Sequence, residues 1–190
     1  MRSYWPDHSV YFLTGATFLH YPYFREPGQK QILLRQFGKI QKKFEISISA
    51  FSIAINHYHI KFFLEKGLDL SKIRQILHGG TSYEYRKRYD AKFKEMWQDS
   101  RVIKVISENM DWKITGYIIG NLLKHKEINN FEDLKNNPFS SYRYTAEKYG
   151  DETARQLVYG VIDVAEDGDG VFNLEKLKKT KVSKPSAKAG

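Results

Sequence analysis

The segment spanning residues 45–65 constrains the fold of this chain more than any other part of its sequence. It reads EISISAFSIAINHYHIKFFLE and is dominated by β-branched and aromatic residues, which favour β-strands. Because its 21 residues are too many for one ordinary strand, a turn or bend at residues 54–56 is expected to divide it into two antiparallel strands. The sequence therefore predicts a β-hairpin here.

Shorter patterns on both sides of this hairpin predict further elements. They are a strand over residues 9–18 and helices over residues 30–44, 69–77, 82–89 and 111–126. Gly79 and Gly80 are expected to interrupt the helical pattern between the second and third of these helices, whereas residues 97–106 fit either a strand or a short helix. This order predicts an α+β fold in which helices cover an antiparallel sheet.

Length and charge bound the organisation of the chain. Its 190 residues suffice for one cored domain with appendages but are few for two full domains. We expect the cored domain over residues 1–150, an acidic helical and turn-rich appendage over residues 151–175 and a basic disordered tail over residues 176–190. The net charge of +9 favours an anionic partner, and residues 1–150 alone carry +9 because the charges of the two appendages cancel.

The sequence contains no cysteine, which excludes a disulfide framework, a thiolate zinc site and a cysteine nucleophile. Any metal ion must therefore be held by His, Asn, Gln or carboxylate side chains. No stretch approaches the ~18 apolar residues that a membrane span needs, so we expect a cytoplasmic protein that has no membrane partner.

Two pairs of polar residues could carry chemistry. If the segment around His57 and His59 is a strand, both imidazoles point to the same face, because side-chain direction repeats every two residues, and they can converge on one metal ion. Tyr117 and Asn121 are four residues apart and share a face of a predicted helix, on which His125 is a candidate proton acceptor or metal neighbour. Residues of these types also occur in ordinary packing, so neither pair is specific alone.

The order of these motifs resembles the single-tyrosine HUH transposases, with the REP-associated tyrosine transposases as the nearest branch. The His-hydrophobic-His motif is followed by a helix, by Trp-Gln at 97–98 and Arg-Val-Ile at 101–103, by Tyr-Ile-x-x-Asn at 117–121 and by Ser-Ser-Tyr at 140–142. Each motif is short, so the specificity of the resemblance lies in their order and spacing.

This resemblance implies a ferredoxin-like α+β domain, with the histidine pair on a central strand and the nucleophile on a late helix. It implies that Tyr117 is the catalytic nucleophile and that His57, His59 and Asn121 bind a divalent metal ion, Mg²⁺ or Mn²⁺. Two histidines would also accept Zn²⁺ or Co²⁺. The implied activity is that of a DNA transposase that cleaves and rejoins single-stranded or hairpin DNA through a 5′-phosphotyrosine intermediate, and relatives suggest a homodimer.

Basic residues on helix surfaces are expected to contact DNA phosphates. The candidates are Lys72, Arg74, Arg86, Lys87 and Arg88, with Lys42 and Lys43 as weaker ones. Two alternative functions stay open: a non-catalytic nucleic-acid-binding protein derived from this fold, and a metal-dependent phosphodiesterase in which water attacks in place of Tyr117. The acidic appendage could also fold back over the basic surface and compete with DNA.

Overall fold

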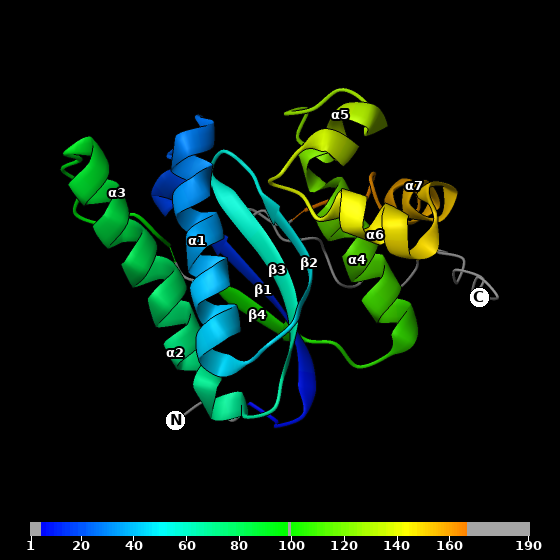
Figure 1. Ribbon diagram of the computed structural model, residues 1–190, viewed down its shortest axis with the longest axis horizontal. Helices are drawn as coiled ribbons and strands as arrows, with labels where there is room; N and C mark the ends of the chain where they lie inside the picture. Colours follow the sequence, from blue (N-terminus) through cyan, green and yellow to red (C-terminus); the bar gives the residue numbers. More distant parts are fainter. Residues whose placement is uncertain (1–4, 99, 167–190) are drawn as a thin grey trace.

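Four antiparallel strands form the central sheet of the computed structural model, which describes residues 5–98 and 100–166 (Figure 1). The strands are β1 (Ser9–Ala16), β2 (Ile48–Ile53), β3 (His57–Leu64) and β4 (Arg101–Lys104). They lie in the order β2-β3-β1-β4, so β3 is paired on both edges. The predicted hairpin is β2 and β3, and the ambiguous segment 97–106 contains a strand.

Helices cover both faces of this sheet. The α-helices are α1 (Pro27–Phe44), α2 (Leu70–Gln75), α3 (Thr81–Tyr89), α4 (Glu108–Lys124), α5 (Phe131–Asn136), α6 (Tyr142–Tyr149) and α7 (Asp151–Tyr159). Figure 1 shows α1, α2 and α3 on one side of the sheet and α4 to α7 on the other. The prediction of an α+β fold with an antiparallel sheet covered by helices is confirmed.

Side-chain alternation along β3 separates the two helical layers. Tyr58, Ile60 and Phe62 belong to the apolar core shared with α1 and α2. The residues between them point the other way, because successive side chains of a strand alternate between its faces. His59 therefore lies against Tyr117 of α4, and Lys61 reaches the beginning of the same helix.

The helical pattern after β3 continues through Gly79 and Gly80 rather than breaking there. A π-helical turn over Ile76–Gly80 joins α2 to α3 and takes up both glycines. A β-carbon on Gly80 would lie 2.5 Å from the side-chain oxygen of Gln36, so glycine at this position permits the close approach of α1. The predicted interruption is wrong because glycine here serves helix packing and does not end the helix.

Helix α7 packs on the helix that carries Tyr117. Three residues of α7 are buried there, namely Ala154, Leu157 and Val158. A β-carbon on Gly116 would lie 2.2 Å from the carbonyl oxygen of Leu157, and one on Gly120 would lie 2.5 Å from the side chain of Val158. These two glycines, one turn apart on α4, therefore allow the two helices to touch.

The division of the chain at residue 150 stays a prediction, and the predicted basic tail lies outside the described residues. Two short helices, α5 and α6, were not among the expected elements. In the described ranges, no helix combines the length and the apolar character that crossing a membrane requires.

Candidate active site

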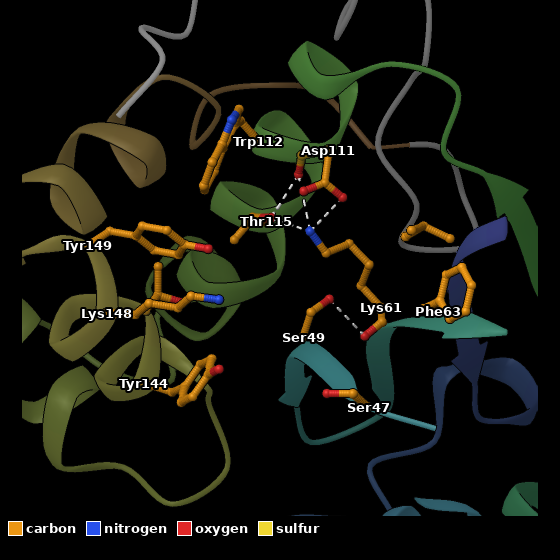
Figure 2. Close-up of a pocket in the computed structure, with 12 residues that line it drawn as sticks. Ser47, Ser49, Lys61, Phe63, Asp111, Trp112, Thr115, Tyr144, Lys148 and Tyr149 are labelled. Carbon is orange, nitrogen blue, oxygen red and sulfur yellow. Dashed lines mark hydrogen bonds and ion pairs between the residues drawn. The ribbon is translucent and has the colours of Figure 1, made fainter. Parts of the chain in front are cut away.

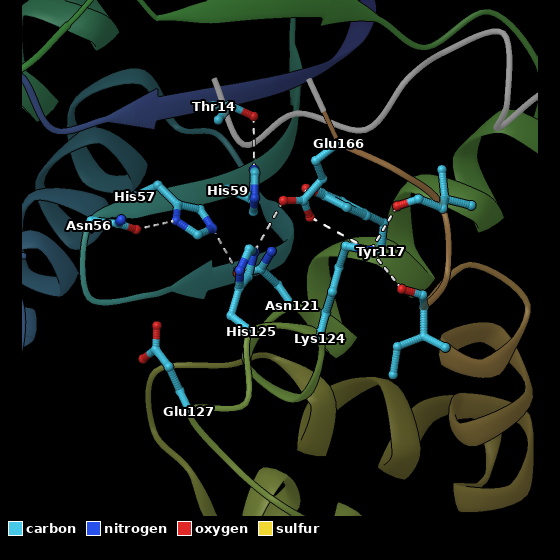
Figure 3. A network of polar contacts seen from close by, with 12 residues as sticks. Thr14, Asn56, His57, His59, Tyr117, Asn121, Lys124, His125, Glu127 and Glu166 are labelled. Atoms are coloured by element: carbon cyan, nitrogen blue, oxygen red, sulfur yellow. Dashed lines mark hydrogen bonds and ion pairs between the residues drawn. The ribbon is translucent and has the colours of Figure 1, made fainter. Parts of the chain in front are cut away.

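The four residues predicted to carry chemistry lie together between β3 and α4 (Figure 3). The ring centroids of His57 and His59 are 4.9 Å apart, and that of Tyr117 lies 5.0 Å from that of His59. His57 Nε2 is 3.1 Å from Asn121 Oδ1. All four residues are buried, so a strand and a helix whose contacting residues His57 and Asn121 are 64 positions apart in sequence form one polar site within the core.

Asn56 fixes the orientation and the proton of His57. Its Nδ2 donates to the carbonyl oxygen of His20, which leaves its Oδ1 facing His57 Nδ1 at 2.7 Å. Because an amide oxygen can only accept, Nδ1 carries the hydrogen. Burial, reinforced by the nearby charge of His125, lowers the pKa of His57 to about 3, so the ring is neutral and its Nε2 bears a lone pair.

Two lone-pair atoms consequently face each other at this site. His57 Nε2 has no hydrogen to donate, and the Asn121 oxygen 3.1 Å away is also an acceptor. The Asn121 side-chain nitrogen is buried and has no hydrogen-bond partner in the described part of the chain. Opposed lone pairs are stabilised by a cation between them, so this pair is arranged as metal ligands are.

His59 is prepared in the same way. Thr14, directly opposite it on β1, places its hydroxyl 2.8 Å from His59 Nδ1. His59 Nε2 is buried and has no hydrogen-bond partner among the described residues. Metal-binding histidines usually donate their second ring N–H to a neighbouring oxygen, which fixes the tautomer, and Thr14 and Asn56 are placed to receive those hydrogens.

The donor set fits a divalent metal ion. Across residues 5–98 and 100–166, no three His, Cys, Asp or Glu side chains are grouped so that they could hold a metal, so His57 and His59 would need the amide oxygen of Asn121 as their third ligand. Two imidazole nitrogens and one amide oxygen suit Mn²⁺ or Mg²⁺ and also Zn²⁺.

Tyr117 is held by a carboxylate that sequence reasoning did not identify. Its hydroxyl donates to Glu166 Oε1 at 2.8 Å, and Glu166 Oε2 lies 3.4 Å from His125 Nε2. Burial raises the pKa of Tyr117 well above its usual value, and the charge of Glu166 and this hydrogen bond raise it further. In this arrangement the phenol keeps its proton, and a negative charge lies directly at its oxygen.

Lys124 holds the segment that carries Glu166. Its ammonium group donates to the carbonyl oxygens of Ile162 and Val164 at 2.6 and 2.7 Å, and it lies 3.9 Å from Glu166 Oε1. Figure 3 shows Glu166 reaching between Tyr117 and His125 from this segment. The only sequence signal was the acidic character of the segment that begins at Glu166. The rest of that segment lies outside the described residues, so the hypothesis that it folds back over the basic surface stays a prediction.

The structure does not bring the predicted DNA-binding residues to this site. Lys72 and Arg74 lie on α2, and Arg86, Lys87 and Arg88 lie on α3, in the helical layer on the opposite face of the sheet. Arg86 donates to the carbonyl oxygen of Phe93, and Lys72 pairs with Asp69 at 3.0 Å, whereas Lys87 and Arg88 are exposed. Lys42 and Lys43, in the last turn of α1, belong to the same layer.

A buried tyrosine beside paired imidazoles, in an α+β protein of net charge +9, favours an enzyme that acts on an anionic substrate. Among protein-family models, the one described as "Transposase IS200 like" matches residues 18–121, which is more than half of the chain. The chain therefore belongs to the IS200-like transposase family, and the predicted family and enzyme class are confirmed.

A solved structure shows the same fold. The structure of a REP-associated tyrosine transposase bound to a REP hairpin is similar with a TM-score of 0.59 and 19% sequence identity, over 88% of this chain and 91% of that chain. A structure of a candidate transposase from Deinococcus radiodurans R1 is 17% identical over 62% of this chain and 93% of that chain, and its TM-score of 0.43 is too low to support a fold assignment. No curated protein matches the chain.

Proposed function

We propose that this transposase cleaves and rejoins single-stranded, hairpin-associated DNA through a covalent bond between Tyr117 and a 5′ phosphate. The observation that carries the proposal is that the ring centroids of Tyr117 and His59 are 5.0 Å apart. His59 Nε2 is buried and has no hydrogen-bond partner among the described residues. A nucleophile beside side chains that can hold a metal ion is the arrangement that metal-assisted phosphoryl transfer to a side chain needs.

His57, His59 and Asn121 are the residues that would hold Mg²⁺ or Mn²⁺. When bound, such an ion supplies positive charge that polarises the scissile phosphate and stabilises the negative charge that develops on it. The chain's own contribution is to fix both imidazole tautomers through Asn56 and Thr14, so that two lone pairs point toward one place.

The proposed step exchanges one phosphodiester bond for another. Tyr117 Oη forms a bond to phosphorus as the bond from phosphorus to the 3′ oxygen of the preceding nucleotide breaks. The proton that leaves the phenol is balanced by the proton that the departing 3′ hydroxyl gains. Because the new linkage keeps the energy of a phosphodiester, a second 3′ hydroxyl can reverse the step and join strands.

Glu166 is too weak a base to remove the Tyr117 proton. Burial pushes its pKa up, but hydrogen bonds from His125 and Tyr117 leave it below its usual value, whereas the pKa of Tyr117 is raised. Even ordinary Glu and Tyr differ by about 6 pKa units, which corresponds to about 8 kcal/mol. Glu166 therefore stabilises the resting phenol, and its charge opposes the entry of a phosphate.

Three further features support hairpin DNA as the partner. The similar solved protein is bound to a REP hairpin, and the βαββαβ succession with strand order β2-β3-β1-β4 fits the ferredoxin-like domain expected for an HUH motif on a central strand. The exposed basic residues of α2 and α3 supply charges that can hold the phosphates of a stem. In this account they bind DNA away from the bond that is cut.

The test is a covalent trapping assay with an end-labelled DNA hairpin that carries unpaired flanks, in Mg²⁺ or Mn²⁺. After denaturation, the wild-type chain is expected to retain DNA, and Tyr117→Phe is expected to lose the adduct. Cleavage that persists in Tyr117→Phe would identify a phosphodiesterase that uses water, and binding without cleavage would identify a nucleic-acid-binding protein.

A further inference from the structure

A pocket lies on the other flank of the helix that carries Tyr117 (Figure 2). It encloses 380 Å³ where α4 and α6 face β2 and β3, and the described residues that line it include none of the candidate active site. This volume falls in the range of about 300–1,000 Å³ that small-molecule sites occupy. The proposed strand-transfer step makes no use of this pocket.

Aromatic rings form two walls of this pocket. Tyr149 of α6 packs edge-on against Trp112 of α4 with ring centroids 5.0 Å apart, and Tyr144 lies on the same wall. Phe63 of β3 faces them from the opposite wall in Figure 2. Tyr144 is 53% exposed and Phe63 is 43% exposed, so both rings present open surface on which a flat ring can stack.

A lysine occupies the mouth of the pocket between two of these rings. Lys148 Nζ lies 5.1 Å from the ring centre of Tyr149 and 5.9 Å from that of Tyr144. Because the Lys148 side chain is exposed, its ammonium group remains available to an anion outside the aromatic walls. A stacked ring and a bound anion would therefore be neighbours, as the base and the phosphate of a nucleotide are.

The floor of the pocket carries an ion pair whose lysine is buried. Lys61 Nζ, on a side chain that is only 4% exposed, donates to Asp111 Oδ1 at 2.7 Å and to the Thr115 hydroxyl at 2.6 Å. Burial lowers the pKa of Lys61, and the Asp111 charge opposes that shift. Lys61 engages Oδ1, and the Asp111 side chain is 32% exposed, so its carboxylate can accept from a further N–H at this floor.

We propose that this pocket binds one unpaired nucleotide of the DNA substrate. Its base stacks on Tyr144 and Tyr149, its amino group donates to Asp111 Oδ2, and its phosphate lies at Lys148. The identification of the ligand as DNA rests on the proposed function. Adenine, cytosine and guanine carry an exocyclic amino group, whereas thymine offers a carboxylate only its ring N3–H, so the pocket disfavours thymine.

The test scans 2-aminopurine, a fluorescent base that stacking quenches, through the unpaired flanks of a DNA hairpin bound to the full chain. A chelator is present in place of the divalent metal ion, so the DNA is bound but not cleaved and the fluorescence reports binding alone. A failure of the covalent trapping assay would count against the proposed cleavage and not against this pocket. Quenching is expected at one flank position. Tyr149→Ala is expected to restore the fluorescence there and to weaken binding about tenfold.

Tyr144→Ala repeats the test at an exposed side chain, so the proposal stays falsifiable if Tyr149→Ala does not fold. Tyr83→Ala is the matched control, because Tyr83 is 67% exposed on α3 in the other layer, and it is expected to leave the quenching unchanged. Thymine at the quenched position is expected to weaken binding. Quenching that is absent, or that survives both pocket variants, would overturn the proposal.

Discussion

At the scale of single residues, the site depends on where a few hydrogens lie. Asn56 accepts a hydrogen bond from Nδ1 of His57, and the Thr14 hydroxyl lies beside Nδ1 of His59. The Nε2 atoms of both rings therefore keep their lone pairs inside the protein. A buried polar atom without a partner costs about 1–3 kcal/mol. The chain bears this cost at His59 Nε2, which is expected where a bound metal ion would accept the nitrogen's lone pair.

Glu166→Gln is expected to accelerate formation of the Tyr117 adduct. The substitution keeps the shape of the side chain but removes the charge that raises the pKa of Tyr117 and that repels an incoming phosphate. Two charges 4 Å apart repel by about 1 kcal/mol even in bulk water, which corresponds to an increase of about fivefold. The rate of covalent trapping measures this effect, and its pH profile should move to lower pH because the pKa of Tyr117 falls.

Asp163→Asn provides the control for that substitution, since it removes an exposed negative charge three residues earlier in the same segment. It is expected to leave the rate unchanged. An adduct that forms more slowly in Glu166→Gln than in the wild-type chain would show that the carboxylate assists the reaction.

At the scale of elements, the packing of α7 on α4 places Glu166 in the site. Gly116→Ala would bring a β-carbon to within 2.2 Å of the Leu157 carbonyl oxygen, and a backbone atom cannot move aside cheaply. We expect a loss of about 2 kcal/mol in the free energy of unfolding, measured with urea, because inserting an atom into a packed contact forces the helices apart.

Gly38→Ala is the matched helical control, because a β-carbon at Gly38 of α1 would meet nothing within 4 Å. There the substitution is expected to stabilise the protein by about 0.5–1 kcal/mol, since alanine favours helix more than glycine does. Equal effects of the two substitutions would contradict the close contact between α4 and α7.

A carboxylate also joins α3 to α1. Burial pushes the pKa of Glu84 up, but hydrogen bonds from Lys39, Arg35 and Gln36 lower it to about 2, against an unfolded value of 4.5. A group whose folded pKa is depressed stabilises the fold above its unfolded pKa, and this contribution is lost as the pH falls from 4.5 toward 2. Allowing for solvent screening, the contribution is about 1 kcal/mol.

Comparison of the wild-type chain with Glu84→Gln checks this assignment. The free energy of unfolding, measured by denaturant titration between pH 6 and pH 3, should fall more steeply for the wild-type chain. Parallel pH dependences would show that Glu84 does not act as the link between α1 and α3.

The elements that could be predicted are those with a clear period. Alternation along residues 57–64 placed His57 and His59 on one face of a strand, and helical spacing placed Tyr117 and Asn121 together. Strand β3 and helix α4 pack together because each has an apolar side to bury. The order of motifs supplied what periodicity could not, namely that these two pairs belong to one site.

The elements that could not be predicted depend on contacts far apart in the chain. Glu166 lies 49 residues from Tyr117, and nothing in its local sequence distinguishes it from a solvated acid. In the sequence alone, Gly80 is indistinguishable from a helix-breaking glycine. Its role in packing is evident only from the contact with the Gln36 side chain. Helices α5 and α6 have six and eight residues, which is too short for a strong apolar period.

At the scale of the whole molecule, the sheet separates two layers with different proposed tasks. The layer of α4 to α7 carries the buried polar site, whereas the exposed basic residues of α2 and α3 lie on the other side. The double variant Lys87→Gln with Arg88→Gln is therefore expected to weaken hairpin binding without slowing adduct formation at saturating DNA. If both charges meet duplex phosphates, the slope of log affinity against log salt should fall by about 1.8.

Arg143→Gln combined with Lys135→Gln is the control, because it removes two positive charges from the other layer. This control is expected to change the salt dependence of hairpin binding less than the double variant on α3 does. If the loss of Lys87 and Arg88 leaves the salt dependence of hairpin binding unaltered, that surface of α3 does not bind DNA.

The central claim is that Tyr117 forms the covalent bond to DNA, and the polarity of the adduct tests it most directly. The hairpin substrate is labelled at its 3′ end in one sample and at its 5′ end in another, and the protein is digested after denaturation. A bond to a 5′ phosphate predicts that only the 3′ label stays with the protein and that mass spectrometry finds the nucleotide on the peptide containing Tyr117. Retention of the 5′ label, or a modified peptide that lacks Tyr117, would contradict the account.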